Sequence, residues 1–102
     1  MTDRPRVIRH LSIRGRVQGV GYRDWMERNA LSRGLEGWVR NRRDGSVEAA
    51  LAGPDTQVHA MVESCWRGPV NARVDVIDQT QAEEPTLEQR RLGELFSVLR
   101  TV

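Results

Sequence analysis

Hydrophobic and polar residues alternate along several short stretches of the chain, and in two longer stretches the hydrophobic residues recur every three or four positions. Alternation is typical of a β-strand that buries one face, whereas the longer spacing places hydrophobic residues on one side of an α-helix. The patterns predict strands over residues 7–13, 35–42, 46–52 and 72–78, with a short final strand over residues 95–99. They predict helices over residues 22–33 and from residues 53–55 to Trp66. Residues 80–91 are polar and predict a loop.

Glycine and proline residues mark the ends of these elements. Asp44 and Gly45 stand between the second and third predicted strands, and both residue types tolerate the positive φ of a tight hairpin turn. Gly34 follows the first helix, and Gly68-Pro69 ends the second. The predicted order is therefore strand, helix, strand, strand, helix, strand, with one extra C-terminal strand. This order is that of a ferredoxin-like α+β sandwich, in which two helices cover one face of an antiparallel sheet.

Size and composition fit one small domain, which we assign to residues 1–102 with a core of about residues 7–100. The net charge is only +2, and all 16 basic residues are arginine, which excludes a Walker lysine or a Schiff base. The single cysteine, Cys65, excludes an internal disulfide. No hydrophobic run approaches the roughly 20 residues that span a membrane, and the charged first six residues lack a signal-peptide pattern. A cytoplasmic monomer is the expectation.

The segment from Ile13 to Arg23 carries the strongest chemical signal. Gly15, Gly19 and Gly21 lie between the first predicted strand and the first predicted helix, directly before Arg23. Glycines at such a junction let several backbone N–H groups converge, and the start of a helix adds the positive end of its dipole. An arginine in the first turn completes a cradle for a phosphate group. An ordinary glycine-rich turn beside a surface arginine is the alternative.

A second motif runs along the predicted central hairpin. It comprises Gly37-Trp-Val-Arg-Asn41, then Asp44-Gly45, Val47 and Gly53. Asn41 is a polar residue in an otherwise hydrophobic strand, and burial of its amide without a partner costs about 1–3 kcal/mol. Asn41 therefore either caps the turn, faces solvent or serves a ligand.

Together the two motifs resemble the acylphosphatase family. The first resembles its signature at Val17-Gln18-Gly19-Val20 followed by Tyr22 and Arg23, and the second resembles its other signature. Agreement continues through Trp66, Gly68-Pro69, Ala72 and Val74, so that the resemblance covers residues 7–100. Some members carry a bulkier residue where Gly21 stands. The resemblance implies hydrolysis of acyl phosphates, with the phosphate held by Arg23 and by a binding loop of Arg16, Val17, Gln18, Gly19, Val20, Gly21 and Tyr22, and with the attacking water oriented by Asn41.

This chemistry requires little further machinery. A carboxylate is a good leaving group, so no general acid is needed, and an arginine with a ring of amides can stabilise the transferred phosphoryl group. The water can give its proton to a phosphate oxygen, which predicts a reaction without metal or cofactor. His10 and His59 stand far apart without metal-ligand spacing, and we expect a strand-face and a helix-surface histidine. Cys65 lies on the hydrophobic stripe of the second helix and is expected in the core.

Other functions remain open at this point. The fold is shared with RNA-recognition modules, although the aromatic motif of those modules is missing, so we expect no nucleic-acid partner. A module that binds acyl or carbamoyl phosphate with little turnover is the other alternative. We expect phosphate or sulfate to occupy the site. The acyl group is undefined, because acetyl phosphate, carbamoyl phosphate and 1,3-bisphosphoglycerate present the same phosphate.

Overall fold

The computed structural model describes residues 6–102 as a five-stranded sheet with two α-helices and one 3-10 helix. The first five residues lie outside the described residues, and with them most of the charged segment on which the expectation of no signal peptide depends. The elements are β1 (Arg6–Arg16), α1 (Tyr22–Ser32), β2 (Glu36–Asn41), β3 (Val47–Pro54), α2 (Asp55–Cys65), β4 (Arg73–Gln81), η1 (Glu84–Gln89) and β5 (Phe96–Val98).

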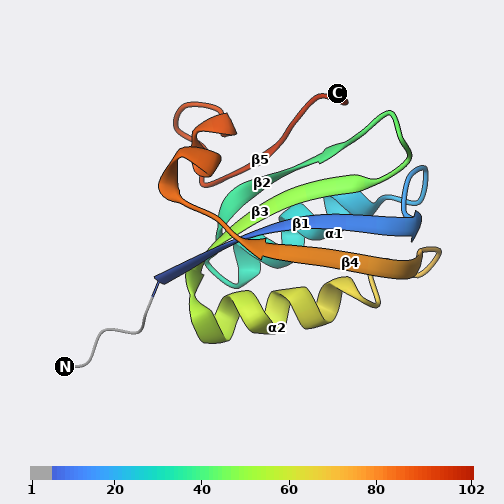
Figure 1. The fold of residues 1–102 in the computed structure, drawn as a ribbon, viewed down its shortest axis with the longest axis horizontal. Helices are drawn as coiled ribbons and strands as arrows, with labels where there is room; N and C mark the ends of the chain where they lie inside the picture. The colour runs from blue at the N-terminus through green and yellow to red at the C-terminus, as the bar shows by residue number, and fades with distance from the viewer. Residues whose placement is uncertain (1–5) are drawn as a thin grey trace.

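The strand order across the sheet is β4-β1-β3-β2-β5. Four strands form the predicted antiparallel arrangement, because β1 pairs antiparallel with both β3 and β4, and β2 pairs antiparallel with β3. The predicted C-terminal strand is present as β5, but it runs parallel to β2, so the complete sheet is mixed. Both α-helices lie against one face of the sheet (Figure 1). The predicted ferredoxin-like sandwich is therefore confirmed, with one parallel edge added to it.

The main hydrophobic core lies between the sheet and the two helices. Tyr22, Met26 and Ala30 of α1 are buried, and Trp25 packs beside them partly buried. From α2, the predicted stripe of Val58, Met61, Val62 and Cys65 is buried as well. The predicted helix extends to Trp66, but α2 ends at Cys65, and Trp66 is 46% exposed. The helical spacing of hydrophobic residues continues to Trp66, one residue beyond the end of the helix, so the spacing alone does not show where the helix ends.

Residues 80–91 are more ordered than the predicted loop. Strand β4 continues to Gln81, and residues 84–89 form η1 on the sheet face that the α-helices leave open. Leu87 of η1 is buried in a second, smaller core that includes Trp38, and the Trp38 indole N–H donates a 2.8 Å hydrogen bond to the carbonyl of Thr86. A single buried leucine within a polar stretch does not create a hydrophobic period, which explains why the sequence pattern missed this element.

Two motif glycines permit close contact between paired strands. Gly37 has a φ of 150°, and a Cβ atom there would lie 1.9 Å from the carbonyl oxygen of Ala50 on β3. Gly15 has a φ of 132° at a register shift between β1 and β4, and a Cβ atom there would lie 2.2 Å from the carbonyl oxygen of Arg73. Any larger residue at either position would force the strands apart.

The close approach at Gly37 predicts a large loss of stability in Gly37→Ala. We expect the free energy of unfolding to fall by more than about 3 kcal/mol, because the added methyl group collides with backbone that cannot yield. Gly34→Ala is the matched control: its φ is 70°, but no atom lies within 4 Å of the added Cβ, so about 1–2 kcal/mol is expected. Urea unfolding measures both variants. Equal losses would contradict the steric explanation.

Candidate active site

The loop between β1 and α1 brings backbone N–H groups to the start of a helix. Gly19 and Gly21 have φ values of 74° and 81°, in the left-handed region that glycine adopts without strain. Gly21 is the N-cap residue of α1 and supplies no side-chain oxygen to the first turn. The N–H groups of that turn therefore remain available to an anion, and Arg23 lies among them.

A pocket of about 120 Å³ opens between this loop and the end of β2. It is lined by Val17, Gln18, Gly19, Gly21, Tyr22, Arg23, Asp24 and Asn41. The structure thus brings together both predicted catalytic residues and five of the seven predicted loop residues. Arg16 is exposed at the end of β1 and Val20 packs against the core, and neither lines the pocket.

Arg23 and Asn41 are free to bind a ligand. Within residues 6–102, neither side chain forms an ion pair or a hydrogen bond with another protein group. Both side chains are partly buried, so the pocket restricts the directions from which solvent reaches them. A charged guanidinium and an amide that can both donate and accept are therefore held at one small cavity without internal partners.

The side chain of Gln18 fastens the loop to the β2–β3 hairpin. Its Nε2 donates hydrogen bonds of 2.7 Å to the carbonyl of Arg42 and 2.9 Å to the carbonyl of Ser46. Figure 1 shows the loop and the hairpin at the same end of the sheet. The resemblance to the family predicts Gln18 in the binding loop, but it does not predict the partners of the Gln18 side chain. These two bonds fix the position of Asn41, at the end of β2, relative to Arg23.

Tyr22 anchors the start of α1 from below. Its hydroxyl donates a 2.6 Å hydrogen bond to the carbonyl of Cys65 at the end of α2, and the ring is buried. Burial raises the pKa of the Tyr22 hydroxyl far above its ordinary value, so this group remains neutral and structural. The Cys65 side chain is fully buried, which confirms its predicted place in the core. Burial also raises the pKa of its thiol to about 12.

Two arginines of the hairpin, Arg40 and Arg42, are held by Glu48. Arg40 and Arg42 both donate to one carboxylate oxygen of Glu48, at 2.7 Å and 2.8 Å, and His10 lies 2.6 Å from the other oxygen. Burial alone would raise the pKa of Glu48, but the hydrogen bonds from His10, Arg40 and Arg42 outweigh it and lower the pKa to about 2. Arg40 and Arg42 therefore share the single negative charge of Glu48, which offsets only one of them, and Arg43 forms no ion pair within residues 6–102.

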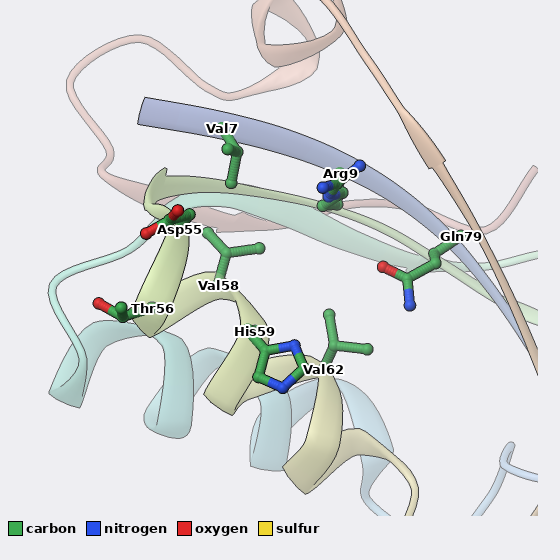
Figure 2. Close-up of a pocket in the computed structure, with 8 residues that line it drawn as sticks. All are labelled: Val7, Arg9, Asp55, Thr56, Val58, His59, Val62 and Gln79. Carbon is green, nitrogen blue, oxygen red and sulfur yellow. The ribbon is translucent and has the colours of Figure 1, made fainter. Parts of the chain in front are cut away.

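A larger hollow of about 370 Å³ lies toward the other end of β1 (Figure 2). Val58 and Val62 point from α2 into it, Gln79 reaches it from β4, and His59 stands on the exposed surface of α2 as predicted. It lacks a glycine loop, and the two sequence motifs do not reach it.

Among residues 6–102, no group of three or more histidine, cysteine, aspartate or glutamate side chains is arranged to hold a metal ion. No helix in that range is long and apolar enough to cross a membrane.

The comparisons with known proteins agree with the motifs. The chain matches the family model described as Acylphosphatase over residues 9–91. It is similar to an acylphosphatase of Bradyrhizobium diazoefficiens, with 57% identity over 97 residues that cover 95% of this chain and 98% of that protein. The fold is similar to that of an acylphosphatase from Bacillus subtilis, with 33% identity, a TM-score of 0.79 and coverage of 91% and 98%. An acylphosphatase from Coxiella burnetii gives 27% identity, a TM-score of 0.81 and coverage of 97% and 100%.

Loss of the Gln18 amide should weaken the attachment of the β1–α1 loop to the β2–β3 hairpin. We expect Gln18→Ala to lower the free energy of unfolding by about 1–3 kcal/mol, because the hydrogen bonds to two carbonyls are lost. We also expect kcat to fall by roughly tenfold or more, since small misplacements of positioned groups reduce rates strongly. Gln81→Ala, at an exposed position of β4, is the control and should change neither quantity. An unchanged kcat in folded Gln18→Ala would contradict the positioning role.

The Glu48 cluster predicts part of the acid sensitivity of the fold. Because the pKa of Glu48 is lowered from 4.5 to about 2 in the folded protein, its contribution to stability is complete above pH 4.5 and is lost as the pH falls toward 2. Glu48→Gln should therefore be less stable than the wild type at pH 6, and the gap should narrow toward pH 2. Urea midpoints measured across this range test it, with exposed Glu63→Gln as the control. A constant gap would contradict the assignment.

Proposed function

The chain belongs to the acylphosphatase family, and we propose that it hydrolyses acyl phosphates at the pocket between the β1–α1 loop and Asn41. As a family member it is a hydrolase acting on the anhydride of a carboxylic acid and phosphate. The observation that carries the proposed site is the convergence of Arg23 and Asn41, from separate elements, on one pocket without internal partners. We also propose that the enzyme is a monomer, as expected from the sequence.

In this proposal the phosphoryl group lies against the loop of residues 16–22. The backbone N–H groups of the loop and of the first turn of α1 donate to its oxygens, and the guanidinium of Arg23 binds two of them. Arg16, at the start of the loop, adds positive charge from outside the pocket wall. The small volume of the pocket suits a phosphate or a sulfate, and these anions are expected to compete with the substrate.

Asn41 positions the water that attacks phosphorus. Its carbonyl oxygen accepts a hydrogen bond from the water, and its amide N–H₂ donates to the water or to a phosphate oxygen. Its strand is held to the loop by Gln18, so the water is presented in a fixed direction relative to Arg23. Orientation of this kind removes much of the entropic cost of the reaction.

The bond changes balance without a protein acid or base. The water oxygen forms a bond to phosphorus while the bond between phosphorus and the acyl oxygen breaks. The electron pair of the broken bond stays on the acyl oxygen, which leaves as part of the carboxylate. The proton of the water passes to a phosphate oxygen. Tyr22 takes no part in this transfer, because its hydroxyl is bound to the carbonyl of Cys65. A cytoplasmic location fits a small-molecule substrate of this kind and remains a prediction from the sequence.

Removal of the arginine tests phosphate binding. We expect Arg23→Ala to lose both turnover of benzoyl phosphate and inhibition by inorganic phosphate, because a charge-assisted contact to the anion disappears. Arg28→Ala, an exposed arginine one turn further along α1, is the matched control and should behave as the wild type. Assays in excess EDTA also test the metal-free mechanism. Wild-type turnover that EDTA abolishes would overturn that mechanism.

Removal of the asparagine tests water positioning. Asn41→Ala should keep its affinity for inorganic phosphate while kcat falls by roughly 10²–10³-fold, because only the orientation of water is lost. Asn71→Ala, at an exposed position after α2, is the control. Phosphate inhibition constants and kcat for benzoyl phosphate separate the two effects. Normal kcat in Asn41→Ala would refute the role assigned to Asn41.

A further inference from the structure

Asp24 is the one carboxylate among the described residues that line the proposed active-site pocket. It follows Arg23 in the first turn of α1 and lines the same cavity as Arg23 and Asn41. Among residues 6–102, no basic side chain lies within ion-pair distance of it, including Arg28 four residues further along the helix. The sequence motifs do not include this position. The pocket proposed for the phosphoryl group therefore also holds a negative charge that forms no ion pair within residues 6–102.

We propose that Asp24 makes this enzyme select acyl phosphates whose acyl group carries no further negative charge. The proposal rests on the proposed function, because it assigns the acyl specificity of that same site. Arg23, the loop amides and the helix start all act on the phosphoryl group, which every acyl phosphate presents equally. A carboxylate beside this group distinguishes substrates by what else they carry. Neutral acyl groups such as acetyl, benzoyl or carbamoyl are favoured over groups with a second phosphate or a carboxylate.

The size of the pocket determines how strongly Asp24 is expected to discriminate between charged and neutral acyl groups. A sphere of about 120 Å³ is about 6 Å across, and two unit charges at that separation, at an effective dielectric constant of about 40–80, change binding about three- to tenfold. Discrimination of this order alters relative rates without preventing turnover of either substrate. It also weakens with added salt, since the pocket is open to solvent.

The neighbouring arginines are partly paired, and the effect of Asp24 adds to the field that they leave. Arg40 and Arg42 both bind Glu48, and the nearest nitrogen of Arg14 lies 3.8 Å from a carboxylate oxygen of Asp44. Two carboxylates therefore face three arginines, so that one unit of positive charge remains in this group. Among the described residues that line the pocket, Asp24 alone carries a negative charge, and its replacement isolates the effect of that charge.

The test compares benzoyl phosphate with 3-carboxybenzoyl phosphate, which differ by one carboxylate. The measured quantity is the ratio of their kcat/KM values. We expect Asp24→Asn to shift this ratio about three- to tenfold toward the carboxylated substrate, and the shift to shrink as ionic strength rises. Asp55→Asn is the matched control, because Asp55 stands in the first turn of α2, is exposed and lies outside the active-site pocket. It should leave the ratio unchanged.

Two outcomes would overturn the proposal. An unchanged ratio in active Asp24→Asn would show that the carboxylate does not act on the acyl group. A collapse of kcat for benzoyl phosphate in Asp24→Asn, with the fold intact, would instead make Asp24 a general base. Failure of the proposed function itself is distinguishable, because the wild-type enzyme would then turn over neither substrate at this pocket and Arg23→Ala would change nothing.

Discussion

The two hydrogen bonds from the Gln18 side chain are the contact on which the site depends. They join the carbonyls of Arg42 and Ser46 to the loop that precedes α1. The loop is too short to form a cavity by itself, and Asn41 stands on a different element. By its hydrogen bonds to the hairpin, Gln18 holds the loop of the first motif beside Asn41 of the second, so that residues of both motifs line one pocket. The phosphate-binding and water-binding groups thereby keep a fixed mutual geometry before any ligand arrives.

Other contacts in the fold hold the β1–α1 loop and the β2–β3 hairpin in place. Gly15 and Gly37 allow the strands on either side to approach so closely that a methyl group would not fit. Tyr22 ties the first residue of α1 to the end of α2 through a buried hydrogen bond. These features leave Arg23, Asn41 and Asp24 as the side chains at the pocket without internal partners. Most of the motif residues are therefore structural, and few of them carry the chemistry.

The sequence pattern predicted the element order and the helix-facing core, because each of these produces a local pattern. The joint contribution of Arg23 and Asn41 to one site followed only from the resemblance to the family. Features that depend on contacts between distant residues escaped prediction. The parallel pairing of β5, the burial of Leu87 on Trp38, and the partners of the Gln18 side chain are of this kind. The second helix was predicted to include Trp66, but it ends at Cys65, because periodicity does not reveal where a helix ends. Asp24 gave no signal, since a carboxylate near a helix start is ordinary.

Titration of the ¹⁵N-labelled protein with inorganic phosphate tests the central claim most directly. If the pocket between the loop and Asn41 is the phosphoryl site, the largest shifts will occur at the backbone amides of residues 17–23 and at the side-chain amide of Asn41. The resonances of the larger hollow, at Arg9, His59 and Gln79, will not move. Shifts centred on that hollow, with the loop unaffected, would contradict the account and place phosphate binding at the other end of β1.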